Sequence, residues 1–346
     1  MRVLTLGRLL LRCGILAAIL FVVVVVALKF GAVPVSLYGL GRDLFHLILR
    51  QTSSISSDYG LIIIDIRLPR ILLAIVVGAS LSVAGTSFQA LLRNPLADPY
   101  VLGASSGAAL GAVLALIAEP HVAVSPALAA LFTPLGAFLG AGATVTAVYF
   151  LGRREGQIDS DMLLLVGIIT ASFLSAIIMF LMTTLAGRDL RGMVFWLMGD
   201  LSSSLQPGLR WVLGVGFVLA TSAIYTTASD LNILLSGEKE AMHLGVDVPR
   251  VRFVVYVAAS LLTGLAVSVS GAIGYVGLLV PHVMRLIFGS DHRVLIPTAA
   301  FGGAIAVVIA DTLARTVVAP SELPVGAMTA LAGAPLFLYL LRRRLA

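Results

Sequence analysis

Long apolar stretches alternate with short polar breaks along this chain, and most of the apolar stretches are long enough to cross a bilayer. A membrane-spanning helix needs about 20 mostly apolar residues. By that length the sequence predicts ten spans, at residues 9–30, 68–92, 101–118, 127–151, 162–185, 211–228, 253–270, 273–288, 294–317 and 326–341. Residues 193–205 form a further, amphipathic segment. We therefore expect an all-α polytopic membrane protein.

One long charged interruption, residues 230–252, breaks this apolar pattern. Residues 238–244 within it are mostly good helix formers, and Gly245 follows them. This order is typical of a short helix closed by a glycine cap. A polar helix between two membrane spans is expected to contact a partner in the aqueous phase, although a solvated connector would have the same composition.

Composition supports a single membrane domain over residues 1–346. Hydrophobic residues make up 59% of the chain and charged residues 12%, whereas soluble domains carry about 25% charged residues. The spans leave no room for a separate catalytic domain. The single cysteine, Cys13, excludes an intrachain disulfide. The first apolar run follows several arginines and favours an uncleaved first span over a cleaved signal peptide.

The net charge of +6 is better explained by cytoplasmic loops than by nucleic acid, because such loops carry an excess of Lys and Arg. With the N-terminus inside, fourteen positive residues fall on the inner face and nine on the outer face. The outer nine are Lys29, Arg42, Arg50, Arg67, Arg70, Arg188, Arg191, Arg210 and Arg315. This predicts that both termini and the 230–252 loop are cytoplasmic, and it leaves the outer arginines to be explained.

Catalytic and nucleotide-binding motifs are missing from the sequence. It contains no GxxxxGK[ST], HExxH, CxxC or GxSxG pattern, so it cannot bind ATP through a P-loop, and a membrane-embedded enzyme has no visible catalytic cluster. An ion-coupled secondary transporter remains an alternative, but such carriers place ionisable residues deep in several spans. Here Asp311 is almost alone. Glycines at four-residue spacing, Gly103–Gly107–Gly111 and Gly136–Gly140, predict close helix packing.

Several motifs, in order, carry a family resemblance. They are RLPR at 67–70, GxxxQxxxRNPLADPxxLG at 85–103, a block over 271–297 that contains GYVGLxxPHxxR, and a block over 324–335. Together they resemble the FecCD-type permeases, the membrane subunits of type II ABC importers for iron-siderophores, haem and cobalamin. The resemblance implies the type II importer permease fold in the bacterial inner membrane and transport of an iron chelate, with a cobalamin importer of the same family as the alternative.

The resemblance also implies partners. A homodimer, or a pair of homologous permeases, would work with two ATPase subunits and with a periplasmic or lipid-anchored substrate-binding protein. ATP and Mg would be bound by the ATPase, so this chain would be no enzyme and would hold no cofactor and no metal ligand.

Site residues follow from the same matches. The 230–252 loop resembles the family's cytoplasmic coupling loop, with the ATPase-coupling residues Gly237, Glu238, Ala241, Leu244, Gly245, Val246 and Arg252. The outer arginines Arg67, Arg70 and Arg315 match positions that dock the binding protein. Headgroup contact is the alternative for Arg67 and Arg70, and pairing with Asp311, four residues earlier, is the alternative for Arg315.

Two further matches concern the pathway. Ser160 and Asp161 match a polar pair that narrows the channel at its inner mouth. Trp196 and Gly199 lie in residues 193–205, which resemble an outer amphipathic helix that caps the pathway.

Overall fold

The computed structural model describes residues 6–31, 62–122, 125–154, 157–184, 190–202 and 206–345. This part of the chain is nearly all helical, and its only strands are β1 (Arg153–Arg154) and β2 (Gln157–Ile158), which form an antiparallel pair. The long helices are α1 (Leu6–Lys29), α4 (Leu68–Leu91), α5 (Ala104–Ala118), α6 (Pro126–Leu151), α7 (Ser160–Thr184), α9 (Pro207–Thr226), α12 (Val248–Ser270), α13 (Val276–Phe288), α14 (His292–Thr316) and α15 (Val325–Leu345).

Shorter elements join the long helices. A π-helical turn, η2 (Ile62–Arg67), leads into α4, and the 3-10 turns η3 (Pro99–Leu102) and η4 (Glu119–His121) flank α5. The short α-helices are α8 (Leu190–Leu197), α10 (Ala228–Leu234) and α11 (Glu238–His243). Each of the ten predicted spans coincides with a long helix. Seven helices within the described ranges are long and apolar enough to cross a membrane, while Val276–Phe288 and Val325–Tyr339 are apolar but shorter.

The amphipathic segment differs from its predicted range. α8 begins at Leu190 and ends at Leu197 instead of covering 193–205. Gly199 adopts a left-handed backbone with φ of +83°, and the Asp200 N–H donates to the carbonyl of Ser270 at 2.8 Å. The chain therefore turns away from the helix axis to pair with the end of α12.

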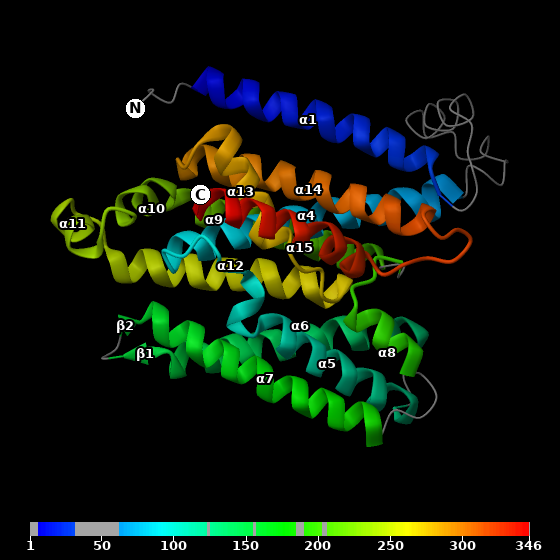
Figure 1. Cartoon of the computed structure of the whole chain (residues 1–346). Coiled ribbons are helices and arrows are strands. Elements are labelled where there is room, and N and C mark those ends of the chain that lie inside the picture. The colour runs from blue at the N-terminus through cyan, green and yellow to red at the C-terminus, as the bar shows by residue number, and fades with distance from the viewer. Residues whose placement is uncertain are drawn as a thin grey trace.

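The helix α4 is the centre of the larger helix group, and α12, α13 and α14 pack against it (Figure 1). Backbones approach so closely here that a Cβ atom on Gly85 would collide with the carbonyl of Gly277, and one on Gly78 with the carbonyl of Gly303. Only glycine allows such contact between helix backbones. This packing leaves α4 buried over 83% of its apolar window.

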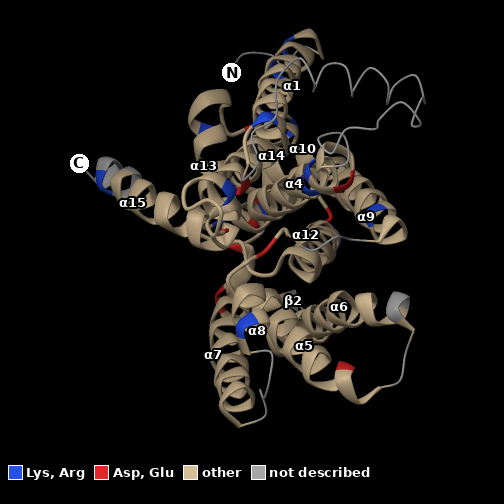
Figure 2. Cartoon of the chain, turned by 90° about the vertical axis from the view of Figure 1, so that its right-hand side faces the viewer, with Lys and Arg blue, Asp and Glu red and all other residues tan. Residues whose placement is uncertain are grey.

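A second group consists of α5, α6, α7 and α8, seen below the first in Figure 2. A Cβ on Gly107 would collide with the carbonyl of Gly140, and one on Gly111 with that of Gly136. The glycine spacing therefore serves close packing of α5 on α6, as predicted. The α7 helix, by contrast, is buried over only 17% of its apolar window, which leaves a long apolar face on this chain without a neighbouring helix.

The two ends of the bundle carry different elements. α1 begins and α15 ends at the end that also carries α10, α11 and the β1–β2 hairpin, and α8 lies at the other end (Figure 1). We call these the α11 end and the α8 end. With 23 residues at about 1.5 Å each, α12 is about 35 Å long and joins them.

Candidate functional site

At the α11 end, two glycines delimit the short helix α11. Gly237, with φ of +126°, precedes it, and Gly245, with φ of +83°, follows it. The Val246 N–H donates to the Ala241 carbonyl at 3.0 Å, and the Gly245 N–H to the Met242 carbonyl at 3.0 Å. These paired hydrogen bonds form a Schellman cap. The predicted helix with its glycine cap is confirmed.

The two faces of α11 differ in chemistry. Ala241 and Val246 are buried against the bundle, whereas Met242 is 54% and Leu244 is 69% exposed. Lys239, Glu240 and His243 are exposed beside them. Two large apolar side chains set among charges on a projecting helix are a surface suited to another protein.

Glu238 and Arg252, both predicted coupling residues, bind inside the chain. One carboxylate oxygen of Glu238 accepts hydrogen bonds from Arg93 Nη2 at 2.9 Å and from Arg252 Nη2. Arg252 is 5% exposed, and its Nη1 donates to the Ile158 carbonyl at 3.0 Å. Arg93 follows α4 with a left-handed φ of +48°. Hence Glu238 joins α11 to the ends of α4 and α12 and, through Arg252, to β2.

A second polar junction ties α10 to the start of α14. Asn232 Nδ2 donates to Asp291 Oδ1 at 2.8 Å, and the His292 N–H donates to Asn232 Oδ1 at 2.9 Å. Asp291 also accepts from Arg293, and these hydrogen bonds, with that from Asn232, hold the pKa of Asp291 at about 2. The segment that carries α11 is therefore held by two polar junctions, one at Glu238 and one at Asn232.

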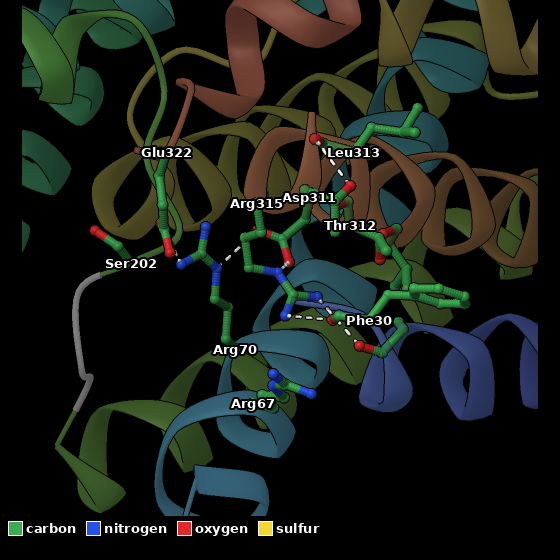
Figure 3. A network of polar contacts seen from close by, with 12 residues as sticks. Phe30, Arg67, Arg70, Ser202, Asp311, Thr312, Leu313, Arg315 and Glu322 are labelled. Carbon is green, nitrogen blue, oxygen red and sulfur yellow. Dashed lines mark hydrogen bonds and ion pairs between the residues drawn. The ribbon is translucent and has the colours of Figure 1, made fainter. Parts of the chain in front are cut away.

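The three arginines predicted to be outer lie in one cluster at the α8 end (Figure 3). Arg70 Nε is 2.7 Å from Asp311 Oδ1, and Arg70 Nη1 is 2.7 Å from Glu322 Oε2. Arg315 Nε lies 2.9 Å from Asp311 Oδ2. Asp311 is 0% exposed. The alternative for Arg315, an ion pair with Asp311, is what the structure shows.

Two of these arginines also hold the end of α1. Arg67 Nη1 donates to the carbonyls of Leu28 at 2.6 Å and Lys29 at 3.2 Å. Arg315 donates to those of Ala27 and Phe30, each at 3.5 Å. The last carbonyls of a helix have no partner within the helix and carry partial negative charge. The buried Arg67 guanidinium thus serves α1 rather than lipid headgroups. Docking of a binding protein through these arginines stays a prediction.

The predicted gate residues stand at the start of α7, directly after the β1–β2 hairpin. Asp159, not Asp161, caps the helix, because its Oδ1 accepts from the N–H groups of Asp161 and Met162, each at 3.0 Å. Asp161 is exposed, and the buried Ser160 Oγ has no hydrogen-bond partner among the described residues. Their role in a gate stays a prediction.

At the opposite end, Trp196 and Gly199 lie over the junction of α8 with α12 and α15. The Gly199 N–H donates to Trp196 O at 3.1 Å, and the Val325 N–H donates to Gly199 O at 2.9 Å. Beside them a cavity of about 790 Å³ opens between α5, α7 and α8, and its lining includes Ser105 and Ser175. A capping role over a pathway fits this place and stays a prediction.

Reasoning from the sequence missed several residues of these sites. Met242 escaped because a single methionine in a polar segment gives no signal, and Glu322 because it lies in a short loop. Arg93 stood within a motif without an assigned partner. Among the described residues no group of three His, Cys, Asp or Glu side chains is placed to hold a metal ion.

Taken together, a bundle of apolar helices, a cavity among them and a projecting polar helix define a multi-pass membrane transport protein. The profile of the FecCD transport family matches residues 19–343, and the chain belongs to that family. It is 43% identical to the cobalamin import system permease protein BtuC of Halobacterium salinarum, over 81% of this chain and 73% of that protein.

Two further comparisons agree. The chain is 43% identical to the hemin transport system permease protein HmuU of Yersinia pestis, over 81% of this chain and 83% of that protein. A solved structure of a metal-chelate type ABC transporter in an inward-facing conformation superposes with a TM-score of 0.79 at 30% identity, and covers 96% of this chain and 98% of the other.

Proposed function

We propose that this permease carries an iron chelate, a siderophore complex or haem, across the bacterial cytoplasmic membrane, powered by two separate ATPase subunits. Membership of the FecCD transport family supports the transport role. The observation that carries the ATPase partnership is the projecting helix α11, whose Met242 and Leu244 are exposed among charged neighbours at the end where α1 begins and α15 ends. A chain without a P-loop needs such a contact to be driven by ATP.

The proposed ATPase contact is centred on Leu244 and Met242. Their side chains would fill a groove in the ATPase, while Lys239, Glu240 and His243 surround them. Interface energy concentrates in buried apolar anchors surrounded by a polar rim. Gly237, Ala241, Gly245 and Val246 would act indirectly, by fixing the shape of the helix that presents these anchors.

The outer partner would be a substrate-binding protein at the α8 end. Arg67, Arg70 and Arg315 form one cluster there with Asp311 and Glu322, in which Arg70 pairs with both carboxylates and Arg315 pairs with Asp311. Complementary acidic groups on a partner would be attracted to it.

The substrate path would run beneath α8, through the cavity between α5, α7 and α8, towards Ser160 and Asp161. Phe173, Met179 and Phe180 on α7 are each more than 60% exposed, a face suited to a second copy of the chain. We therefore propose a homodimer, or a pair with a homologous permease, with the path between the copies.

A secondary, ion-coupled mechanism has little support. Its best proton carrier, Asp311, lies between Arg70 and Arg315 at ion-pair distance from both. Both oxygens of this carboxylate are thus engaged in ion pairs with arginines of the same chain.

The test is reconstitution in proteoliposomes with the ATPase and binding protein expressed from the same bacterium. Wild-type chain is expected to co-purify with the ATPase and to take up ferric siderophore or haem only with ATP. The Met242→Ser/Leu244→Ser double variant should bind the ATPase about tenfold more weakly, as expected for two lost apolar anchors. Arg293→Gln, at the same end, should bind it as tightly as the wild type. Uptake driven by an ion gradient without ATP would overturn the importer mechanism, and uptake of cobalamin alone would overturn the iron substrate.

A further inference from the structure

At the α11 end, the carboxylate of Glu238 connects several elements of the chain. Glu238 is the first residue of α11, and its Oε1 accepts from Arg93, which follows α4, and from Arg252 in α12. Arg252 in turn donates to Ile158 in β2. Glu238 thereby connects α11, the end of α4 and α12 and, through Arg252, also β2.

The helix α11 needs the rest of the chain to hold it in place. It is six residues long, too short to be stable in water without support. Its buried contacts with the bundle come from the apolar side chains of Ala241 and the following Val246, and apolar burial is not directional. Charge-assisted hydrogen bonds are directional. The orientation of α11 therefore depends on the carboxylate of Glu238.

The elements at the other ends of these bonds lead into the transport region. β2 is followed directly by Asp159, the cap of α7, and by Ser160. Arg93 follows α4, the buried centre of the larger group. Arg252 is 5% exposed, so solvent ions do not screen its bonds. A force applied to α11 has a direct polar route to α4 and to the start of α7.

We propose that Glu238 is a positioning residue that makes α11, the end of α4, the start of α12 and the β1–β2 hairpin move as one body. This inference rests on the proposed function for its purpose, which is to convert ATPase movement at α11 into movement of α4 and α7. Glu238 itself makes no contact with the ATPase. Its carboxylate is bound by Arg93 and Arg252 and its side chain is 31% exposed, whereas Leu244 is 69% exposed.

The first experiment needs the permease alone in nanodiscs. Cys13 is replaced by Ser, spin labels are placed at Lys239→Cys on α11 and Asp161→Cys on α7, and the distance distribution is measured with Glu238 or Glu238→Gln. The Gln variant keeps the shape of the side chain and removes its charge. We expect one narrow distribution for Glu238 and a broad one for Glu238→Gln, with Arg293→Gln as the unchanged control. Equal widths would overturn the proposal.

The second experiment uses the reconstituted importer. Glu238→Gln is expected to keep the ATPase bound but to lower substrate transported per ATP by about tenfold, the scale of one lost charge-assisted hydrogen bond. Arg93 is half-exposed, so Arg93→Gln should not disturb folding. This variant should lower the substrate transported per ATP less than Glu238→Gln does, because the bond between Glu238 and Arg252 persists. Loss of ATPase binding in Glu238→Gln, or an unchanged ratio, would overturn the proposal. If the wild-type complex does not form, the proposed function fails, while the distance measurement still tests the bridge.

Discussion

The buried carboxylate of Asp311 offers the sharpest test of the arginine cluster. In Asp311→Asn, the neutral amide retains the shape but turns one acceptor into a donor that faces guanidinium groups. Arg70 keeps Glu322, which is 41% exposed, and among the described residues Arg315 keeps only the carbonyls of Ala27 and Phe30, each at 3.5 Å. Arg70 and Arg315 are 8% and 5% exposed and Asp311 is 0% exposed. Removing one partner of such a buried pair costs about 3–5 kcal/mol.

The exposed ion pair between Asp291 and Arg293 provides the matched control. Its side chains are 32% and 46% exposed, and exposed pairs contribute about 0–1 kcal/mol. Unfolding in mixed SDS and dodecylmaltoside micelles, followed by fluorescence of the two tryptophans, compares Asp311→Asn with Arg293→Gln. We expect a large loss of unfolding free energy for Asp311→Asn that is insensitive to salt, and a small salt-sensitive one for Arg293→Gln. Equal losses below about 1 kcal/mol would refute the argument that burial makes this pair indispensable.

Three other predictions follow from the packing, the buried loop acid and the outer cluster. Gly85→Ala is expected to lower the free energy of unfolding by about 1–3 kcal/mol through overpacking, because its Cβ would meet the Gly277 carbonyl. Gly142→Ala has open space around its Cβ and should leave stability unchanged. Equal thermal stabilities of the two variants in detergent would contradict the close approach at Gly85. Burial raises the pKa of Asp98 from 3.8 to about 6, although the hydrogen bond from the Tyr100 N–H lowers it. The folded protein therefore binds this proton more tightly than the unfolded chain, and the free energy of unfolding should rise by roughly 1 kcal/mol when the pH falls from 7 to 5. Asp98→Asn should lack this rise, and a variant that retains it would contradict the assignment to Asp98. Glu322→Gln removes a carboxylate that competes for Arg70 and should strengthen binding-protein association several-fold at low salt; a titration with no change would count against docking at the cluster.

The Glu322→Gln variant is a better test of docking than charge reversal at the arginines. Arg67 is 4% exposed and binds backbone carbonyls of α1. A glutamate there would set a carboxylate against carbonyl oxygens, so weaker docking could not be separated from misfolding. Glu322, on the half-exposed edge of the cluster, can be changed without that penalty.

Local features of the fold could be predicted from the sequence. Helix formers followed by Gly245 gave α11 with its cap, because a cap depends on residues within one turn. Apolar length gave the positions of the long helices, and the four-residue spacing of Asp311 and Arg315 allowed their pairing as the alternative to docking.

Contacts between distant segments could not be predicted in the same way. Arg70 and Asp311 are 241 residues apart, and no local pattern connects them. The end of α8 at Leu197 depends on Ser270, and the role of Glu238 depends on Arg93 and Arg252 meeting at one oxygen. Three of the arginines predicted to be outer have their contacts in this geometry, since Arg67 and Arg315 bind the end of α1 and Arg70 and Arg315 share Asp311.

The grip of Arg67 and Arg315 on the end of α1 has a consequence for the order in which the protein is assembled. α1 is buried over only 6% of its apolar window and packs chiefly along α14. Both its packing partner and Arg315 are synthesised nearly 300 residues later. α1 must therefore stay in lipid without its main packing partner until the ninth predicted span arrives, and it reaches its place in the finished protein late in biogenesis.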